Sequence, residues 1–141
     1  MNPKKLSEAM SLAKASDYED AIIAPPFIFI EEIAKILKKA KLGAQDVFWE
    51  NPPAGKGVFT GEVSVTELKN LGVEYVIIGH SERRKYLGET DAIINKKVLA
   101  ALGVGLKIIL CVGEDFKIRQ CGKKAVEQFI KKQLEKDLKG I

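Results

Sequence analysis

The sequence contains few of the residues that mark disulfide-rich, metal-binding or membrane-spanning proteins. Of its 141 residues, two are cysteine and one is histidine. Cys111 and Cys121 lie in unlike surroundings and suggest neither a disulfide framework nor a zinc-binding spacing. The apolar runs at 75–78 and 108–112 are far shorter than the ~18 residues of a transmembrane helix. We therefore expect neither a disulfide scaffold nor a transmembrane protein, and no cofactor is predicted.

The sequence also lacks a concentration of charge that would indicate a polyanionic partner. Its 23 Lys and Arg residues are interspersed with 19 Asp and Glu residues, giving a formal net charge of +4. This pattern is typical of solvated helix faces, so neither nucleic acid nor a membrane is expected as a partner. The N-terminal segment is amphipathic and does not resemble the apolar block of a secretory signal. We therefore expect a cytoplasmic protein.

The overall composition is that of a globular domain. Hydrophobic residues make up 46% of the sequence and charged residues 30%, a balance that can bury a core beneath a polar surface. The length of 141 residues is close to the ~150 residues typical of one domain. We expect a single domain over residues 1–141.

Strand-like and helix-like patterns alternate along the chain. A helix is expected to begin at Asn2 and Pro3, and later helices have capping signals at Ser64 and Thr90. Short apolar runs between the helical patterns predict strands. The predicted strands are 21–24, 42–49, 74–79 and 106–112, and the predicted helices are 3–13, 31–41, 65–71, 91–102 and 126–138. Residues 50–63 are rich in Gly and Pro and predict a long functional loop.

Strands separated by helices run parallel through right-handed crossovers, so the expected class is α/β. Two architectures fit about four such strands: an open doubly wound sheet, or part of a (β/α)8 barrel, whose complete form needs ~250 residues. In either architecture, ligands gather at the carboxyl ends of the strands. Functional residues are therefore expected directly after strands.

One such position holds the single histidine. His80 directly follows the predicted strand 74–79 and precedes the polar segment 81–84. A lone histidine is more often a packed or surface residue than a catalyst, but the end of a parallel strand favours a functional role.

The residues around His80 closely resemble the signature of the triosephosphate isomerase family. The resemblance extends along nearly the whole chain, because several separated segments follow the family's order. These segments are Ala24-Pro25-Pro26-Phe27, Gly43-Ala44-Gln45-Asp46-Val47, Phe59-Thr60-Gly61-Glu62-Val63-Ser64, Ile78-Gly79-His80-Ser81-Glu82-Arg83-Arg84 with Glu89, and Cys111-Val112-Gly113-Glu114. The resemblance identifies a partial (β/α)8 barrel that covers roughly family strands two to five.

The resemblance implies three residues of an active site. His80 is similar to the neutral histidine that polarises the substrate carbonyl in the interconversion of dihydroxyacetone phosphate and glyceraldehyde 3-phosphate. Glu82 resembles the carboxylate that orients a catalytic lysine, and Ser81 resembles the residue packed beside the proton-abstracting glutamate. Alternatively, Glu82 and Arg83 form only an ion-paired turn.

The resemblance also implies a homodimer, with the 50–63 loop as its interface arm. Thr60 is expected to enter a neighbouring subunit, and Phe59 to anchor the arm beside Gly61. Glu62 is expected to pair with an arginine such as Arg83 across the interface.

Other family features fall outside this sequence. The family's first strand with its catalytic lysine, the general-base glutamate, the lid and the phosphate-binding turns are not found in it. The resemblance therefore implies negligible activity for this chain alone, with triose phosphate as substrate only if the site is completed. A four-stranded piece of barrel exposes two sheet edges and its interior face. A complementing C-terminal half, self-association or rearrangement into a doubly wound sheet could cover them.

Two other functional readings remain open. The chain could be a non-catalytic oligomeric scaffold that has lost isomerase activity. An unrelated phosphate-binding α/β module is the weakest reading, because no glycine-rich phosphate motif follows any predicted strand.

Overall fold

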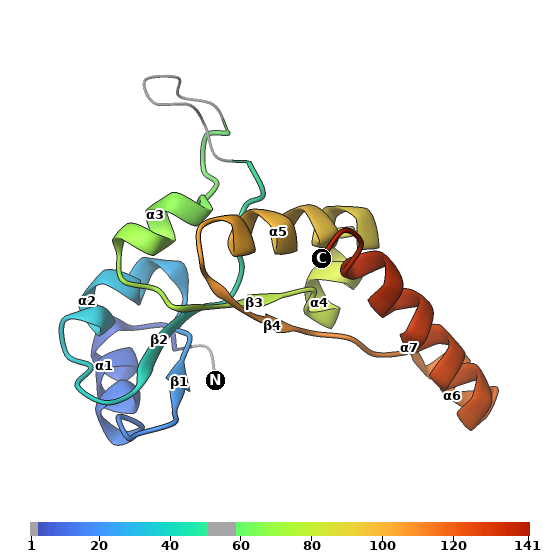
Figure 1. The fold of residues 1–141 in the computed structure, drawn as a ribbon. Coiled ribbons are helices and arrows are strands. Elements are labelled where there is room, and N and C mark those ends of the chain that lie inside the picture. Colours follow the sequence, from blue (N-terminus) through green and yellow to red (C-terminus); the bar gives the residue numbers. More distant parts are fainter. Residues whose placement is uncertain (1–2, 51–58) are drawn as a thin grey trace.

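The computed structural model describes residues 3–50 and 59–141, in which four strands are separated by helices (Figure 1). The elements are α1 (Leu6–Ala15), β1 (Ile22–Ile23), η1 (Phe27–Phe29), α2 (Ile30–Ala34), β2 (Lys41–Ala44), α3 (Val65–Asn70), β3 (Tyr75–Ile78), α4 (Ser81–Tyr86), α5 (Asp91–Gly103), β4 (Lys107–Leu110), α6 (Phe116–Gln120) and α7 (Lys123–Asp137). Among the described residues, no helix combines the length and apolar character that crossing a bilayer requires.

The four strands form one parallel sheet in the order β1-β2-β3-β4. Within it, Val76 of β3 pairs with Ala44 of β2 on one side and Ile108 of β4 on the other. The spatial order follows the sequence order without the reversal that defines a doubly wound sheet. The α/β prediction of about four parallel strands with flanking helices is confirmed, and the arrangement is that of a partial barrel wall.

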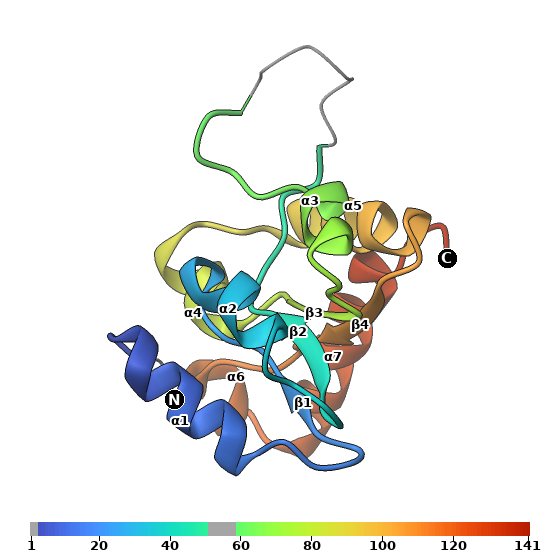
Figure 2. The same cartoon turned by 90° about the vertical axis from the view of Figure 1, so that its left-hand side faces the viewer.

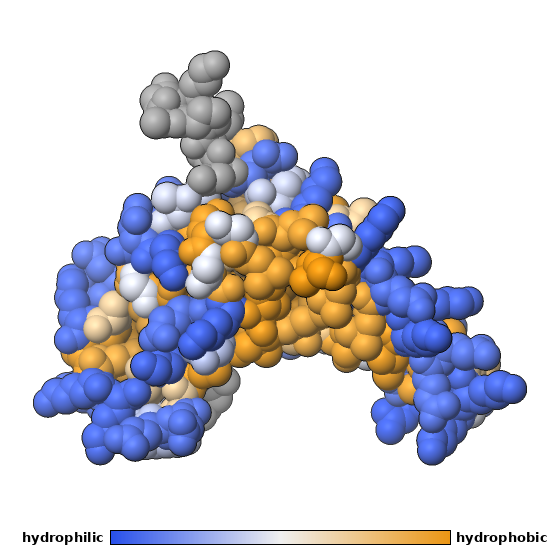
Figure 3. Space-filling model, in the orientation of Figure 1, coloured by the Kyte–Doolittle hydropathy of each residue, from blue (hydrophilic) through white to orange (hydrophobic). Residues whose placement is uncertain are grey.

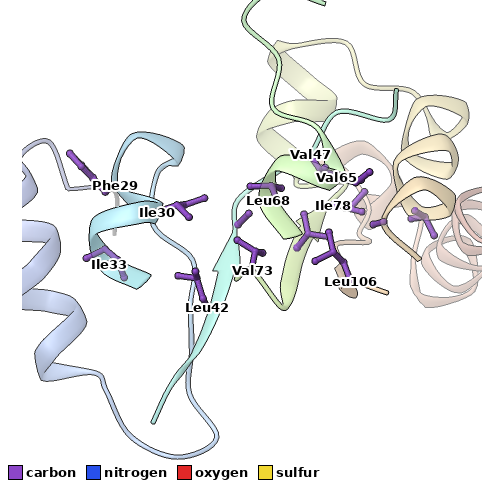
Figure 4. Close-up of a cluster of buried hydrophobic side chains, with 14 of the residues drawn as sticks. Phe29, Ile30, Ile33, Leu42, Val47, Val65, Leu68, Val73, Ile78 and Leu106 are labelled. Atoms are coloured by element: carbon purple, nitrogen blue, oxygen red, sulfur yellow. The ribbon is translucent and has the colours of Figure 1, made fainter. Parts of the chain in front are cut away.

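The hydrophobic core lies between one face of this sheet and the helices that cover it. Helix α5 packs on β3 and β4, while α2 packs on β2. Figure 4 shows buried side chains from these layers, namely Phe29, Ile30, Ile33, Leu42, Val47, Val65, Leu68, Val73, Ile78 and Leu106. The sheet is therefore anchored through one face.

The opposite face of the sheet is only partly covered by this chain. On β3, Val76 and Ile78 are fully buried, whereas the alternate residues Tyr75 and Ile77 are half-buried. Ile77 pairs in register with Ile109, which is also half-buried and lies outside the core cluster. In Figure 3, apolar surface lines a hollow between the α1–α2 end and the α6–α7 end of the molecule. This hollow is the concave side of the partial barrel.

Two predicted helix starts are confirmed by their hydrogen bonds. The Ser64 hydroxyl accepts from the backbone N–H of Glu67, and the Glu67 carboxylate accepts from the backbone N–H of Ser64 at 2.7 Å, which completes a capping box. Thr90 caps α5 by accepting from the N–H of Ile93 at 3.4 Å. These short-range signals fix where α3 and α5 begin.

The prediction of a helix over 31–41 and a strand over 42–49 was wrong in its boundaries. Helix α2 ends at Ala34, and β2 covers only Lys41–Ala44. The Asp17 carboxylate accepts hydrogen bonds from the backbone N–H groups of Lys38, Lys39 and Ala40 at 2.8–2.9 Å. These bonds from a distant loop hold residues 38–40 out of the helix.

The ends of the chain also differ from the predictions. Helix α1 begins at Leu6, with Lys5 at its N-cap and not Asn2, which lies outside the described residues. The strand predicted at 21–24 contracts to Ile22–Ile23. Helix α7 begins at 123, and its buried residues are polar, whereas the predicted apolar stripe is at most half-buried. That stripe consists of Val126, Phe129, Ile130, Leu134 and Leu138.

Candidate active site

A cleft of about 810 Å³ lies where the loops after β1, β2 and β3 meet. Because the three strands are parallel, their carboxyl ends open on the same edge of the sheet, the usual place for a ligand site in this class of fold. The residues that line the cleft are Ala24, Pro26, Phe27, Ile28, Gln45, Asp46, Ile77, His80, Glu82 and Arg83. The structure therefore places two of the predicted site residues, His80 and Glu82, in one cleft. The third, Ser81, lies between them in the chain at the first position of α4.

His80 occupies the junction between β3 and α4. The backbone N–H of Glu82 donates to Nδ1 of His80 at 3.4 Å, so the imidazole itself is the N-cap of the helix. A ring nitrogen that accepts a hydrogen bond carries no proton, so this geometry places the proton of a neutral ring on Nε2. The side chain is 48% exposed and lines the cleft. Its Nε2–H is the group available to a ligand.

Glu82 extends from the first turn of α4 into solvent. Its Oε2 lies 3.7 Å from Nδ1 of His80, and its side chain is 76% exposed. Among residues 3–50 and 59–141, no lysine lines the cleft. The carboxylate therefore has an open side, on which a cation from elsewhere could be held.

Two residues that line the cleft, Asp46 and Arg83, belong to a largely buried network of two acids and two bases. The Lys97 Nζ donates to both carboxylate oxygens of Asp46, at 2.7 and 2.8 Å, and also to Glu89. Arg83 donates to Glu89 at 2.7 Å and pairs with Asp46 at 2.8 Å. Burial raises the pKa of Asp46 against the opposing effect of Lys97, whereas Lys97 and Arg83 together outweigh burial and lower the pKa of Glu89. The four groups compensate one another's charge.

This network was missed at the level of sequence. The interspersed charges predict a solvated helix face for Lys97, yet this residue is 2% exposed. A signal was present, because Lys97 lies three residues after Ile94 and four before Ala101, both fully buried on the same stripe of α5. The network also engages Arg83 within the chain, through Asp46 and Glu89.

The second arginine of α4 enters a separate set of contacts. Arg84 donates to the carbonyl of Gly79 at 2.8 Å, to Asp91 at 2.7 Å and to Asp137 of α7. A weaker contact at 3.4 Å reaches the Cys111 carbonyl. The two neighbouring arginines therefore bind acids in different parts of the fold.

The predicted interface arm is described from Phe59 onward, and residues 51–58 lie outside the described part of the chain. Figure 2 shows the segment after residue 58 extending away from α3. Phe59 to Glu62 are all exposed, and the Phe59 ring lies 4.8 Å from that of Phe48. Phe59 has a positive φ of 67°, and its carbonyl accepts from the N–H of Glu62 at 3.0 Å. These residues contribute nothing to the cleft of this chain.

Within residues 3–50 and 59–141, no three His, Cys, Asp or Glu side chains come together as a metal site.

Comparison with known proteins shows a match between the family model described as triosephosphate isomerase and residues 2–141. The chain belongs to the triosephosphate isomerase family. This membership accounts for the parallel strands with flanking helices, since the family fold is the (β/α)8 barrel.

Three curated triosephosphate isomerases illustrate the similarity. The protein of Thermodesulfovibrio yellowstonii is 52% identical over 120 residues, which are 84% of this chain and 47% of that relative. That of Caldanaerobacter subterraneus is 44% identical over 140 residues, with 98% and 54% covered. That of Lactobacillus delbrueckii is 40% identical over 147 residues, with 100% and 56% covered. The chain thus spans about half the length of these triosephosphate isomerases.

Proposed function

We propose that this chain forms the carbonyl-polarising part of a triosephosphate isomerase active site, acting on dihydroxyacetone phosphate and glyceraldehyde 3-phosphate. The observation that carries the proposal is the geometry of His80. Its Nδ1 is engaged by the backbone N–H of Glu82, and the ring lines a cleft at the carboxyl ends of three parallel strands. Such a ring can offer Nε2–H to a carbonyl oxygen.

The chemistry follows from that hydrogen bond. In triosephosphate isomerases a neutral histidine polarises the carbonyl while a glutamate moves the proton. A donor fixed at the site of developing negative charge stabilises the enediolate without reorganising during the reaction. In our proposal His80 is this donor, Glu82 orients a lysine supplied from outside residues 3–50 and 59–141, and Ser81 packs beside the base.

Among the described residues that line the cleft, the carboxylates are Asp46 and Glu82. Asp46 is bound by Lys97 and Arg83, and the proposal assigns the largely exposed Glu82 to holding a lysine, so neither is assigned as the base. General-base catalysis typically contributes ~10²- to 10⁴-fold. We therefore propose negligible isomerase activity for these 141 residues alone, with the base, lysine and phosphate-binding turns contributed by further polypeptide.

The interface arm belongs to the same proposal. Phe59, Thr60, Gly61 and Glu62 are exposed and project from the loop after β2, which suits contact with a second subunit. We assign Thr60 to the neighbouring active site of a homodimer. Since Arg83 is already paired within its own chain, Glu62 would join an existing network if it approached Arg83 from a partner.

The test is an isomerase assay of the chain alone and after mixing with the two segments of the Thermodesulfovibrio yellowstonii relative that the proposal requires, the first strand with its lysine and the C-terminal half. We expect no turnover alone and measurable turnover on mixing. His80→Gln should lower the turnover of the mixture by at least ~10²-fold, as expected for loss of an oxyanion donor. Substitution of an exposed neighbour, Lys85→Gln, should leave this turnover unchanged. Equal activity of His80→Gln would contradict the assigned role of the imidazole.

A non-catalytic oligomeric scaffold is the second candidate. It is favoured by the apolar hollow of Figure 3 and by the two half-buried isoleucines, Ile77 and Ile109, that face away from the core. Silence of both the chain and the mixture, together with a stable oligomer in analytical ultracentrifugation, would favour this scaffold over the isomerase.

A further inference from the structure

Helix α4, which carries the His80 cap, has no buried residue among its six positions. Apolar packing therefore does not hold the helix against the fold. Its attachment comes from the polar contacts of Arg83 and Arg84, which point to two separate groups of acids. The position of the imidazole depends on these contacts.

Of the two arginines, Arg84 is the one whose side chain binds the backbone directly before His80. Its Nε donates at 2.8 Å to the carbonyl of Gly79, whose peptide bond leads directly into His80. Gly79 has a φ of +80°, and a Cβ at that position would lie 3.0 Å from both Arg84 Nη2 and the Cys111 carbonyl oxygen. The guanidinium thus fits tightly against the backbone turn that orients His80.

The guanidinium is itself fixed from the opposite side by Asp137. This side chain, near the C-terminal end of α7, is 0% exposed and accepts from Arg84 Nη2 through Oδ2. Its other oxygen, Oδ1, has no hydrogen-bond partner among the described residues. The Asp137 carbonyl accepts from the side chain of Asn95 at 3.1 Å, which ties the end of α7 to α5. The buried carboxylate therefore links the Arg84 guanidinium to the end of α7.

We propose that Arg84 and Asp137 are positioning residues for His80, so that α7 sets the orientation and tautomer of the imidazole through the Gly79 carbonyl. The inference deepens the proposed function and rests on it for its catalytic meaning. Neither Arg84 nor Asp137 lines the cleft, and their side chains act through the backbone before His80. An ion pair buried at the base of a helix without apolar anchors is the element that can transmit this constraint.

The single histidine of the chain makes the test direct. Long-range ¹H–¹⁵N correlation spectra of the full chain would report one imidazole, with separate Nδ1 and Nε2 resonances for the Nε2–H tautomer. In Asp137→Asn, these two resonances should move toward a common average, because the turn no longer holds Nδ1 against the Glu82 N–H. The matched control is Glu135→Gln, which removes an exposed carboxylate from the same helix.

A second variant, Arg84→Lys, keeps a cation beside the two acids but cannot span all the Arg84 contacts, and it should produce the same movement. Unchanged imidazole resonances in either variant, with a wild-type helical circular dichroism spectrum, would overturn the proposal. Loss of helical signal in both variants would also overturn it, since the pair would then serve the fold in general. The spectra are recorded without substrate, so their result does not depend on the outcome of the isomerase assay.

Discussion

Lys97 of α5 and Asp46 of the loop after β2 form a fully engaged, buried ion pair across 51 residues of sequence. The lysine is 2% exposed and the aspartate 5%. Through Arg83, the same aspartate is connected to the helix that His80 caps. Ion pairs of Asp46 with Lys97 and Arg83 therefore connect α5 and α4 at the cleft.

Removal of this lysine should strongly destabilise the chain. Lys97→Met keeps the length of the side chain but leaves Asp46 and Glu89 with Arg83 as their remaining cation. Breaking a buried pair typically costs about 3–5 kcal/mol, and the midpoint of urea unfolding should fall accordingly. Lys96→Met is the matched control, because Lys96 is exposed and lies 5.8 Å from the centroid of the Trp49 ring, outside the buried network. Equal midpoints for the two variants would contradict the importance of the network.

The glycine before His80 should tolerate no side chain. Gly79→Ala combines a left-handed φ of +80° with contacts of 3.0 Å to Arg84 and the Cys111 carbonyl, so an added methyl group must displace one of them. Gly88→Ala has a similar φ of +68° but meets nothing within 4 Å, and it reports the backbone cost alone. That cost is about 1–2 kcal/mol. We expect Gly79→Ala to exceed it by at least about 1 kcal/mol in urea unfolding.

The Asp17 contacts should give a defined pH dependence. Hydrogen bonds from the N–H groups of Ala40, Lys39 and Lys38 lower the pKa of Asp17 in the folded chain. Because the folded pKa is depressed, the stabilisation is complete above the unfolded pKa of about 4 and is lost as the pH falls through the folded value. Wild type should therefore be more stable than Asp17→Asn at pH 6, and the difference should vanish at lower pH. A difference that grows on acidification would contradict this assignment.

The two faces of β3 should respond unequally to truncation. Ile78→Ala opens a cavity in the core and should cost about 2–5 kcal/mol. Ile77 lies on the half-buried face, so Ile77→Ala should cost clearly less in dilute solution. Chemical denaturation at several protein concentrations provides the measurement. A cost for Ile77→Ala that rises to match that of Ile78→Ala with concentration would show that a second molecule covers the concave face.

Local sequence signals determined much of the architecture. The alternation of apolar runs and helical patterns predicted a parallel α/β sheet, and the caps at Ser64 and Thr90 located two helices correctly. The motif around His80 predicted both its place after a strand and its family. These features are decided within a few residues along the chain, by periodicity and by side chains that bond to neighbouring amides.

Contacts between distant segments decided the rest. Within the helix expected at 31–41, residues 38–40 instead donate their amides to Asp17, which lies 21 to 23 positions earlier in the chain. The burial of Lys97 and the anchoring of Arg84 by Asp137 likewise required partners 51 and 53 residues distant. Charges of this kind look like solvated surface residues in the sequence. Their burial becomes favourable only when the fold brings an opposite charge within hydrogen-bonding distance, and a one-dimensional pattern contains no such distance.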